Sequence, residues 1–264
     1  MNSSIETLKT LPLSMRLLRD AHRRLMTGVR GKYKCPGEVR TSQNWIGGHS
    51  LNTARYIPPA VEFVQDLLSD LEKFWHNEDI KVSNLVRCAI SHYQFESIHP
   101  FLDGNGRVGR LLIPFYLICK QELTNPSLYI SSYFERNRDA YYDALSSVRK
   151  HNDLIGWVLF FLEALKETAQ TGCDKFKRIF ALRDEMNQYS HRCSNTALVQ
   201  NLFKKLYSTP RTTINQISEM VECNYLTANR MVKKLESDGI LVAATDAKRN
   251  TIYDFKKYLE IFKT

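Results

Sequence analysis

Apolar residues recur at helical spacing along most of the chain, and this pattern predicts a mainly α-helical protein. Each helical segment carries one apolar face, as expected for a helix that packs on a core. One segment also contains Pro114 in its interior, where a proline should kink the helix. The segments predicted to be helical are residues 4–26 (broken near Pro12), 61–74, 82–93, 108–119, 141–148 and 154–189.

Residues 40–57 break this pattern, because two short β-capable runs flank the pair Gly47-Gly48. Such runs around a glycine turn predict a β-hairpin, and a surface loop is the alternative interpretation. A two-stranded ribbon on its own is only marginally stable in water. A hairpin here should therefore pack on the protein, or accept an added strand from a partner chain at its exposed edge.

The pattern changes again from about residue 195. Helical spacing over 197–206, 214–221 and 226–235 is followed by two strand-like runs, residues 240–243 and 250–253. Helix, turn, helix and a two-stranded wing is the winged-helix pattern. Residues 201–264 have a net charge of only +4, from eleven Lys and Arg against seven Asp and Glu. A DNA partner and a protein partner are both open for this domain.

Composition adds little to this picture. The chain has 264 residues and a net charge of +9, which fits a nucleotide, nucleic-acid or acidic protein partner. Its six cysteines are scattered without a C-x-x-C pair, so neither disulfides nor a structural metal site is expected. No apolar run is long enough for a membrane span, and the N-terminus has no signal-peptide pattern. We expect a cytoplasmic protein without membrane contact.

The richest candidate chemistry lies in residues 98–110, between two apolar segments. Pro100 disfavours helical geometry at His99, so the preceding helix should end there. A glycine-rich turn then opens the next helix, which makes an anion site from free amides and the positive end of the helix dipole. Arg107 and Arg110 add guanidinium groups suited to phosphate, and His99 is a candidate general base. These residues together predict a phosphate-binding turn beside a base.

The order of these residues, from His99 to Arg110, resembles the H-P-F-x-[DE]-G-N-[GK]-R-x-x-R signature of Fic-domain proteins. Residues 36–59 resemble the flap of that family, and residues 133–142 are also similar to it. Residues 195–264 are similar to the winged-helix tail of one bacterial branch. The resemblance implies a Fic helical core with a small β-hairpin flap in residues 1–192, followed by a winged helix-turn-helix domain in residues 195–264.

The resemblance also implies an activity, the transfer of AMP from ATP to a Ser, Thr or Tyr hydroxyl of a protein with release of pyrophosphate. His99 would take the hydroxyl proton, Asp103 would hold Mg²⁺, and the flap would align the protein target by strand addition. Tyr141 and Tyr142 would lie near the adenine of ATP. The residues so implied in nucleotide binding are Ile46, Gly47, Gly48, Asp103, Gly104, Asn105, Gly106, Arg107, Gly109, Arg110, Tyr141 and Tyr142.

Many Fic proteins carry an inhibitory [ST]-x-x-x-E-[GN] motif whose glutamate pairs with the last signature arginine. Residues 3–7 have a spacing one residue short of it, and Ser218 to Glu222 has the spacing but is followed by Cys223. We therefore expect an uninhibited chain, or one restrained by a separate inhibitor or by a homodimer.

Two other functions remain open. The same scaffold could transfer another phosphate-containing group, such as UMP, phosphocholine or a phosphoryl group. Gly106 fits the AMP-transferring members better than the lysine of phosphorylating relatives. Alternatively, the chain is a winged-helix DNA-binding regulator with a secondary Fic activity, and strongly salt-dependent binding to duplex DNA would reveal it.

Overall fold

The computed structural model describes residues 12–27, 35–244 and 250–263. The chain divides into two compact units, Met1–Ala169 and Gln170–Thr264, and α8 begins in the first unit and ends in the second. Of the predicted helix 4–26, the described part forms α2 (Met15–Leu25), and the residues before 12 lie outside the described ranges.

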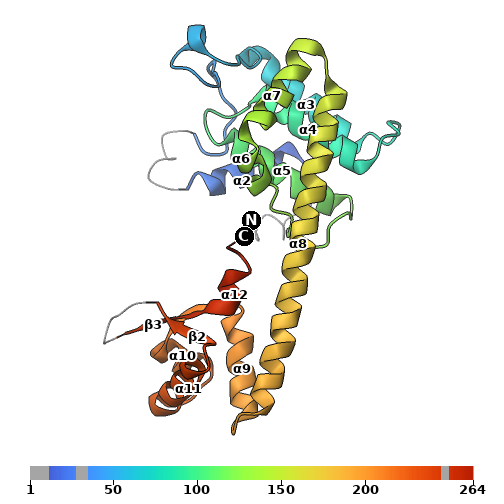
Figure 1. The fold of residues 1–264 in the computed structure, drawn as a ribbon. Helices are drawn as coiled ribbons and strands as arrows, with labels where there is room; N and C mark the ends of the chain where they lie inside the picture. Colours follow the sequence, from blue (N-terminus) through green and yellow to red (C-terminus); the bar gives the residue numbers. More distant parts are fainter. Residues whose placement is uncertain (1–11, 28–34, 245–249, 264) are drawn as a thin grey trace. The chain divides into compact units, whose positions relative to one another are not determined.

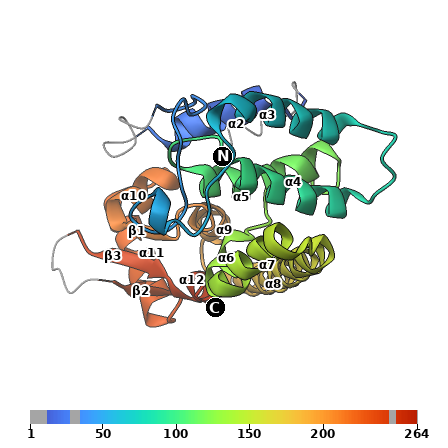
Figure 2. The same ribbon diagram turned by 90° about the horizontal axis from the view of Figure 1, so that it is seen from above.

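The first unit is a helical bundle, as the apolar pattern predicts. Figure 2 shows α4 and α5 between a layer formed by α2 and α3 and a layer formed by α7 and α8. The central position explains why α4 and α5 are buried around most of their circumference. The elements of this unit (Figure 1) are α2, η1 (Leu51–Thr53), α3 (Val61–His76), α4 (Asn84–Ile98), α5 (Asn105–Cys119), α6 (Ser131–Arg136), α7 (Arg138–His151) and the start of α8 (Leu154–His191).

Aromatic side chains join the central helices to α8. Trp157 of α8 is fully buried, and its indole N–H donates to the carbonyl of Ala89 on α4 at 2.8 Å. Phe161 and Trp157 both contact the ring of His92, with centroids 6.0 and 5.9 Å away. Burying aromatic rings of this size contributes several kcal/mol to a core, of order 2 kcal/mol per side chain. The segment from His99 to Arg110 thus connects two helices that are fixed by packing on several sides.

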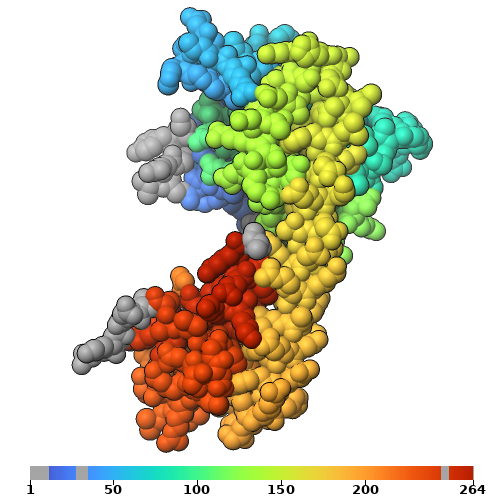
Figure 3. Space-filling view, in the orientation of Figure 1, coloured from blue at the N-terminus to red at the C-terminus, as the bar shows by residue number. Residues whose placement is uncertain are grey.

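Residues 40–57, called the flap below, form a turn with one antiparallel bridge where the sequence predicts a two-stranded hairpin. Ile46 and Tyr56 exchange two hydrogen bonds, of 2.9 and 3.1 Å, and no strand extends from this bridge. Gly47 and Gly48 are both left-handed, and a Cβ at Gly48 would lie 2.1 Å from the carbonyl oxygen of Thr53. The tight turn begins directly after Ile46, so the pairing cannot extend beyond this bridge on the turn side. Figure 3 shows the flap projecting from the first unit.

The second unit combines helices with a three-stranded antiparallel sheet of order β1-β3-β2. Thr213 caps α10: its hydroxyl accepts from the N–H of Gln216, which reciprocates in a capping box. The buried face of α11 packs Ala228, Val232 and Leu235 into this unit's own core. The elements are the end of α8, α9 (Thr196–Leu206), β1 (Arg211–Thr213), α10 (Ile214–Met220), α11 (Tyr225–Ser237), β2 (Leu241–Ala243), β3 (Ile252–Phe255) and α12 (Lys256–Glu260).

Among the described residues, no helix has both the length and the apolar character needed to span a membrane. All six cysteines are free thiols.

Candidate active site

His99 ends α4 in a left-handed conformation, with φ 50° and ψ 60°. Pro100 excludes the right-handed helical region for the residue before it, which is why the helix stops at Ile98 as predicted. A left-handed residue other than glycine costs about 1 kcal/mol or more, and it persists only where the surroundings hold it. The backbone of His99 is therefore fixed by its neighbours.

Two side chains from the start of the flap hold the backbone of His99. Arg40 is buried, and its Nε donates to the carbonyl of His99 at 3.1 Å while Nη2 donates to the carbonyl of Pro59 at 2.5 Å. The amide of Asn44 donates to the carbonyls of His99 (3.3 Å) and Phe101 (3.0 Å). The turned peptide at the catalytic candidate is thus hydrogen-bonded from both sides, by residues more than 50 positions away in the sequence.

The His99 side chain is held in the tautomer that a general base needs. Its Nδ1 lies 3.4 Å from the carbonyl oxygen of Glu96. A carbonyl only accepts, so Nδ1 carries the proton in the neutral ring and Nε2 keeps its lone pair. Burial lowers the pKa of His99 to about 4, against a rise from the Glu96 carbonyl, and Arg40 and Arg149 lower it further. The imidazole is therefore neutral at physiological pH and able to accept a proton.

The turn after His99 opens α5 with backbone amides that are candidates for binding an anion. Gly104 caps the helix with φ 80°, and the first amides of α5 have no acceptors within the helix. The side chain of Asn105 is used to close the turn, because it accepts from the N–H of Phe101 (2.8 Å) and donates to the carbonyl of Phe101 (2.7 Å). Of Asn105, only the backbone N–H can contribute to the anion site.

His22 supports this turn from α2, a role that its place on an apolar helix face did not reveal. Its Nδ1 accepts from the N–H of Gly37 at 2.8 Å, so the proton lies on Nε2, which donates to the carbonyl of Asp103 at 2.9 Å. The ring stacks on Phe101 at 3.9 Å, and a Cβ at Gly104 would lie 3.3 Å from it. Burial lowers the pKa of His22, which keeps this tautomer neutral.

The two signature arginines of α5 have different neighbours. Arg107 is exposed, and its guanidinium donates to the sulfur of Met26 at 2.9 Å, near the end of α2. Arg110 lies over Gly106, where a Cβ would be 3.4 Å from its Nη1. Within the described ranges, Arg110 forms no ion pair or hydrogen bond, so its guanidinium is available to an anion at the first turn of α5.

Asp103 fits the requirements of a magnesium ligand. Its carboxylate is exposed at the turn, and one oxygen accepts from the N–H of Gly104 at 2.6 Å. Mg²⁺ is bound in nucleotide sites by one or two carboxylates together with phosphate oxygens and water. A single exposed carboxylate beside an anion site meets that requirement. No cluster of three or more His, Cys, Asp or Glu occurs among the described residues, so a cage built only of protein side chains is not present there.

Glu96, one turn before His99, is a buried carboxylate that the sequence analysis did not select. Its side chain is 9% exposed, and Oε1 has no hydrogen-bond partner among the described residues. A Cβ at Gly109 would lie 2.2 Å from this oxygen, so the glycine leaves the space that the carboxyl group fills. Burial raises the pKa of Glu96 to about 7, although Arg110 and Arg149 lower it.

This raised pKa predicts how stability depends on pH. The folded protein holds the Glu96 proton more tightly than the unfolded chain, whose ordinary pKa is 4.5. The stabilising contribution is complete below pH 4.5 and is lost as the pH rises through about 7, by about 3 kcal/mol. We expect Glu96→Gln to abolish this loss, so that its free energy of unfolding exceeds that of the wild type at pH 8 but not at pH 4.5. Urea denaturation followed by the fluorescence of Trp75 and Trp157 measures it, and equal differences at both pH values would contradict it.

The two tyrosines predicted near the adenine have different surroundings. Tyr141 is buried, stacks on Phe134 with centroids 4.6 Å apart, and its hydroxyl lies 2.9 Å from Nε2 of His92. Nδ1 of His92 contacts the carbonyl of Gly109 at 2.9 Å, so Nε2 is the acceptor and Tyr141 donates. Tyr141 therefore supports the α5 backbone from the core. Tyr142 is half-buried with the Arg55 guanidinium 5.4 Å from its ring, and its contact with adenine stays a prediction.

The flap residues Ile46, Gly47 and Gly48 lie at the bridge and turn described above. Tyr56, which pairs with Ile46, ties the flap to the end of α4, because its hydroxyl donates to the carbonyl of Ser97 at 2.9 Å. The guanidinium of Arg149 lies 3.6 Å from the Tyr56 ring centroid. The flap is thus anchored next to His99, two residues further along the chain.

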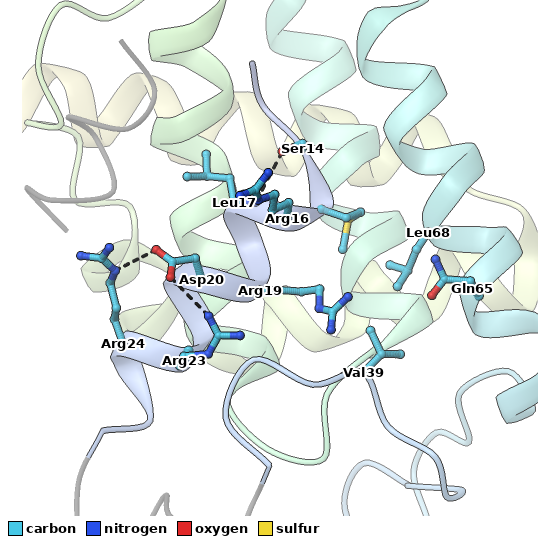
Figure 4. A pocket seen from close by; sticks show the side chains of 11 residues that line it. Ser14, Arg16, Leu17, Arg19, Asp20, Arg23, Arg24, Val39, Gln65 and Leu68 are labelled. Atoms are coloured by element: carbon cyan, nitrogen blue, oxygen red, sulfur yellow. Dashed lines mark hydrogen bonds and ion pairs between the residues drawn. The ribbon is translucent and has the colours of Figure 1, made fainter. Parts of the chain in front are cut away.

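A cavity of about 450 Å³ lies elsewhere in the first unit, along α2 (Figure 4). Four arginines line it, and Asp20 pairs with two of them, Arg23 at 3.5 Å and Arg24 at 2.8 Å. None of the signature residues lines this cavity. It is a charged surface groove, separate from the candidate active site.

A family model matches the part of the chain that contains the candidate site. Residues 12–117 match the model of the Fic/DOC family. Protein adenylyltransferase fic-1 of Caenorhabditis elegans is 36% identical over 78 residues, which are 29% of this chain and 14% of that protein. Protein adenylyltransferase Fic of Culex quinquefasciatus is 31% identical over 157 residues, which are 59% of this chain and 28% of that protein. The chain thus spans less than a third of these curated relatives.

Solved structures share the fold. The crystal structure of a Fic family protein from Desulfovibrio desulfuricans G20 covers 96% of this chain and 72% of its own, with a TM-score of 0.56 and 21% identity. A Fic domain containing signaling protein from Bacteroides thetaiotaomicron covers 65% of this chain and 68% of its own, with a TM-score of 0.51 and 22% identity. The segment that matches the Fic/DOC family model, residues 12–117, contains the whole signature from His99 to Arg110.

Proposed function

We propose that this chain is a protein adenylyltransferase, which transfers AMP from ATP to a Ser, Thr or Tyr hydroxyl of a protein and releases pyrophosphate. The observation that carries the proposal is the neutral His99 imidazole, with a free Nε2, beside the anion-binding turn that opens α5. Relatives named protein adenylyltransferase support the choice of AMP as the transferred group.

The reaction follows from these positions. The hydroxyl proton of the target moves to Nε2 of His99 while the hydroxyl oxygen forms a bond to the α-phosphorus of ATP. The bond between the α-phosphorus and the bridging oxygen to the β-phosphate breaks, and pyrophosphate leaves. General-base catalysis of this kind contributes about 100- to 10,000-fold. The rest of the acceleration comes from positioning and from neutralising phosphate charge.

The anion-binding turn supplies that charge neutralisation. The backbone amides of Asn105 and Gly106, with the guanidinium groups of Arg107 and Arg110, would bind the phosphates. Asp103 would hold Mg²⁺ against the phosphate oxygens, and the ion would supply further positive charge there. His22 and Asn105 keep the turn in the shape that this binding needs.

Transfer of isotope from ATP tests the proposal. The chain is incubated with Mg²⁺ and a lysate, once with ATP labelled at the α-phosphate and once with ATP labelled at the γ-phosphate. Relative to the same lysate without the chain, we expect added label on protein only from the α-phosphate, and mass spectrometry of the labelled peptide should give one adenylyl group on a hydroxyl. A phosphoryl, uridylyl or phosphocholine adduct from the matching donor, without AMP, would contradict it and support another transfer on the same scaffold.

The flap is the proposed docking site of the protein target, which would add a strand to its edge. Trp45 and Ile57 flank the Ile46–Tyr56 bridge and are 42% and 50% exposed, so apolar surface is available there. Replacing both by Ser should raise KM for the target and leave KM for ATP unchanged. An unchanged KM for the target would contradict this docking site.

We also propose that the site is uninhibited within this chain. Among the described residues nothing pairs with the Arg110 guanidinium, which supports this proposal. Residues 3–7, which superficially resemble the inhibitory motif, lie outside the described ranges. Restraint by a separate inhibitor or by a homodimer is the alternative. Activity per chain that does not change on dilution supports the uninhibited form, and activity that rises as a dimer dissociates would contradict it.

For the second unit we propose a winged-helix domain, with β2 and β3 as the arms of the wing. Tyr225 and Leu226 at the start of α11 are 51% and 67% exposed. Lys233 and Lys234 on the same helix already pair with Glu236 (2.8 Å) and Asp238 (3.0 Å). Exposed apolar side chains and compensated cations favour a protein partner over DNA. Fluorescence anisotropy with labelled duplex DNA should give only weak binding lost in moderate salt, and tight sequence-specific binding would favour a DNA-binding regulator.

A further inference from the structure

Glu96 is the buried ionisable group closest to the catalytic base that the proposed reaction does not use. Its Oε2 lies 3.9 Å from Nδ1 of His99, and its own carbonyl oxygen accepts from the same Nδ1 at 3.4 Å. Nδ1 of the imidazole therefore faces two oxygens of one residue. No other carboxylate among the described residues lies within 4 Å of the His99 ring.

The surroundings do not explain this carboxylate as a structural group. Oε1 is buried without a hydrogen-bond partner in the described part of the chain. Arg110 and Arg149 act on Glu96 by their charge, but neither forms an ion pair with it there. A buried carboxylate with an unpaired oxygen weakens a fold. A role of the Glu96 charge in the reaction would explain why the folded protein keeps this carboxylate despite its cost in stability.

The reaction creates a need for that charge. When His99 takes the hydroxyl proton it becomes an imidazolium inside a buried site where Arg40 and Arg149 already act on the ring by their charge. Burial and these cations all disfavour a second positive charge on the ring. An anion beside Nδ1 would offset them at the moment of proton transfer, as a carboxylate does for histidine in other base-assisted transfers.

We propose that Glu96 is a positioning residue for His99, whose ionised carboxylate faces Nδ1, keeps the proton of the neutral ring on that nitrogen, and stabilises the imidazolium formed during transfer. The inference rests on the proposed adenylyltransferase function. It assigns to this chain a His99–Glu96 pair in which the glutamate never touches ATP or the target, and acts only through the histidine.

The His99–Glu96 pair predicts a specific pH dependence of the transfer rate. The titratable and charged groups that face Glu96 are His99 at the end of α4, Arg110 on α5, and Arg149 and Tyr141 on α7. Because the pKa of Glu96 is raised to about 7 by burial, its ionised fraction increases through neutral pH. The pKa of His99 is about 4, so the histidine itself stays neutral over this range. The transfer rate should therefore rise with pH around 7 through Glu96.

Steady-state kinetics of Glu96→Gln, which removes the charge but keeps the size, test the proposal. We expect kcat to fall by about 10- to 100-fold, KM for ATP to stay within about twofold, and the rise around pH 7 to disappear. Glu96→Asp, which keeps a charge, should retain part of kcat and a pH-dependent rise. The matched control is Glu72→Gln, because Glu72 is a half-buried carboxylate that accepts from the N–H of Met15 and has no contact with His99.

The failure of this inference differs from the failure of the proposed function. A wild type that transfers no AMP overturns the function, whereas a transferring wild type with an equally active Glu96→Gln overturns only the pair. Nuclear magnetic resonance of labelled histidine gives a readout that needs no activity and no variant. The chemical shifts of the His99 ring in the wild type should show an inflection near pH 7 from the ionisation of Glu96. A titration curve without this inflection would overturn the inference.

Discussion

His99→Ala is expected to lower AMP transfer by at least about 1,000-fold while leaving nucleotide binding within a few-fold of the wild type. The loss follows from removing the only described group that combines a free imidazole nitrogen with a neutral state at pH 7 beside the anion-binding turn. Binding should persist because the amides of α5 and the signature arginines would contact the phosphates independently of the ring. Single-turnover transfer of label and equilibrium binding of ATP measure the two effects.

The control for His99→Ala is His151→Ala, which removes an exposed imidazole at the end of α7. It should transfer AMP at the wild-type rate. Because His99 is left-handed, its replacement by Ala could also strain the turn by about 1 kcal/mol. His99→Asn separates the two effects, since asparagine tolerates this conformation but is not a base. Transfer by His99→Asn at more than a tenth of the wild-type rate would contradict the assignment of His99.

The helices and the end of α4 could be predicted because their causes are local. A 3.6-residue apolar period gives α3, α4 and α5 within a few residues, and one proline after His99 is enough to end a helix. The Thr213 cap is local in the same sense. Where the cause of an element lies within one segment of the chain, the prediction from sequence agrees with the structure.

The side chains that fix the backbone of the candidate site could not be predicted from local sequence, because their hydrogen-bond partners are distant in sequence. Arg40 and Asn44 reach carbonyls 55 to 59 positions away, and His22 reaches Asp103 across 81 positions. A helical period assigns His22 to the core, which its burial confirms, but does not say that both ring nitrogens are hydrogen-bonded there. A chemical rule could have indicated this role, because both ring nitrogens of a buried histidine need hydrogen-bond partners.

The flap differs from the predicted hairpin for a related reason, and the same reason decides which of the two tyrosines is buried. Alternating β-capable residues favour strands, but the left-handed Gly47 and Gly48 turn the chain before a second pair can form beside Ile46. Two adjacent tyrosines cannot share one helix face, and it is the aromatic surroundings in the bundle that make Tyr141 the buried one. Both outcomes depend on packing that no short window of sequence contains.

Arg40→Ala is expected to have the second large effect, on stability and activity together. Its guanidinium is 2% exposed and donates to the carbonyls of Ser42, Pro59, Ile98 and His99. Removing it leaves buried carbonyls unpaired, and hydrogen bonds from a charged group are worth about 1.5–3 kcal/mol each. We expect a loss of about 3 kcal/mol in the free energy of unfolding and a fall of at least about tenfold in AMP transfer.

Arg40→Lys and the exposed control Arg16→Ala distinguish the causes. The single ammonium of lysine cannot match the planar fork that contacts four carbonyls, so Arg40→Lys should be intermediate in both measurements. Arg16→Ala should change neither, because Arg16 lies on the exposed face of α2. If Arg40→Ala unfolded within about 0.5 kcal/mol of the wild type, the left-handed turn at His99 would not depend on this side chain. The hydrogen bonds of Asn44 would then have to hold the His99 peptide alone.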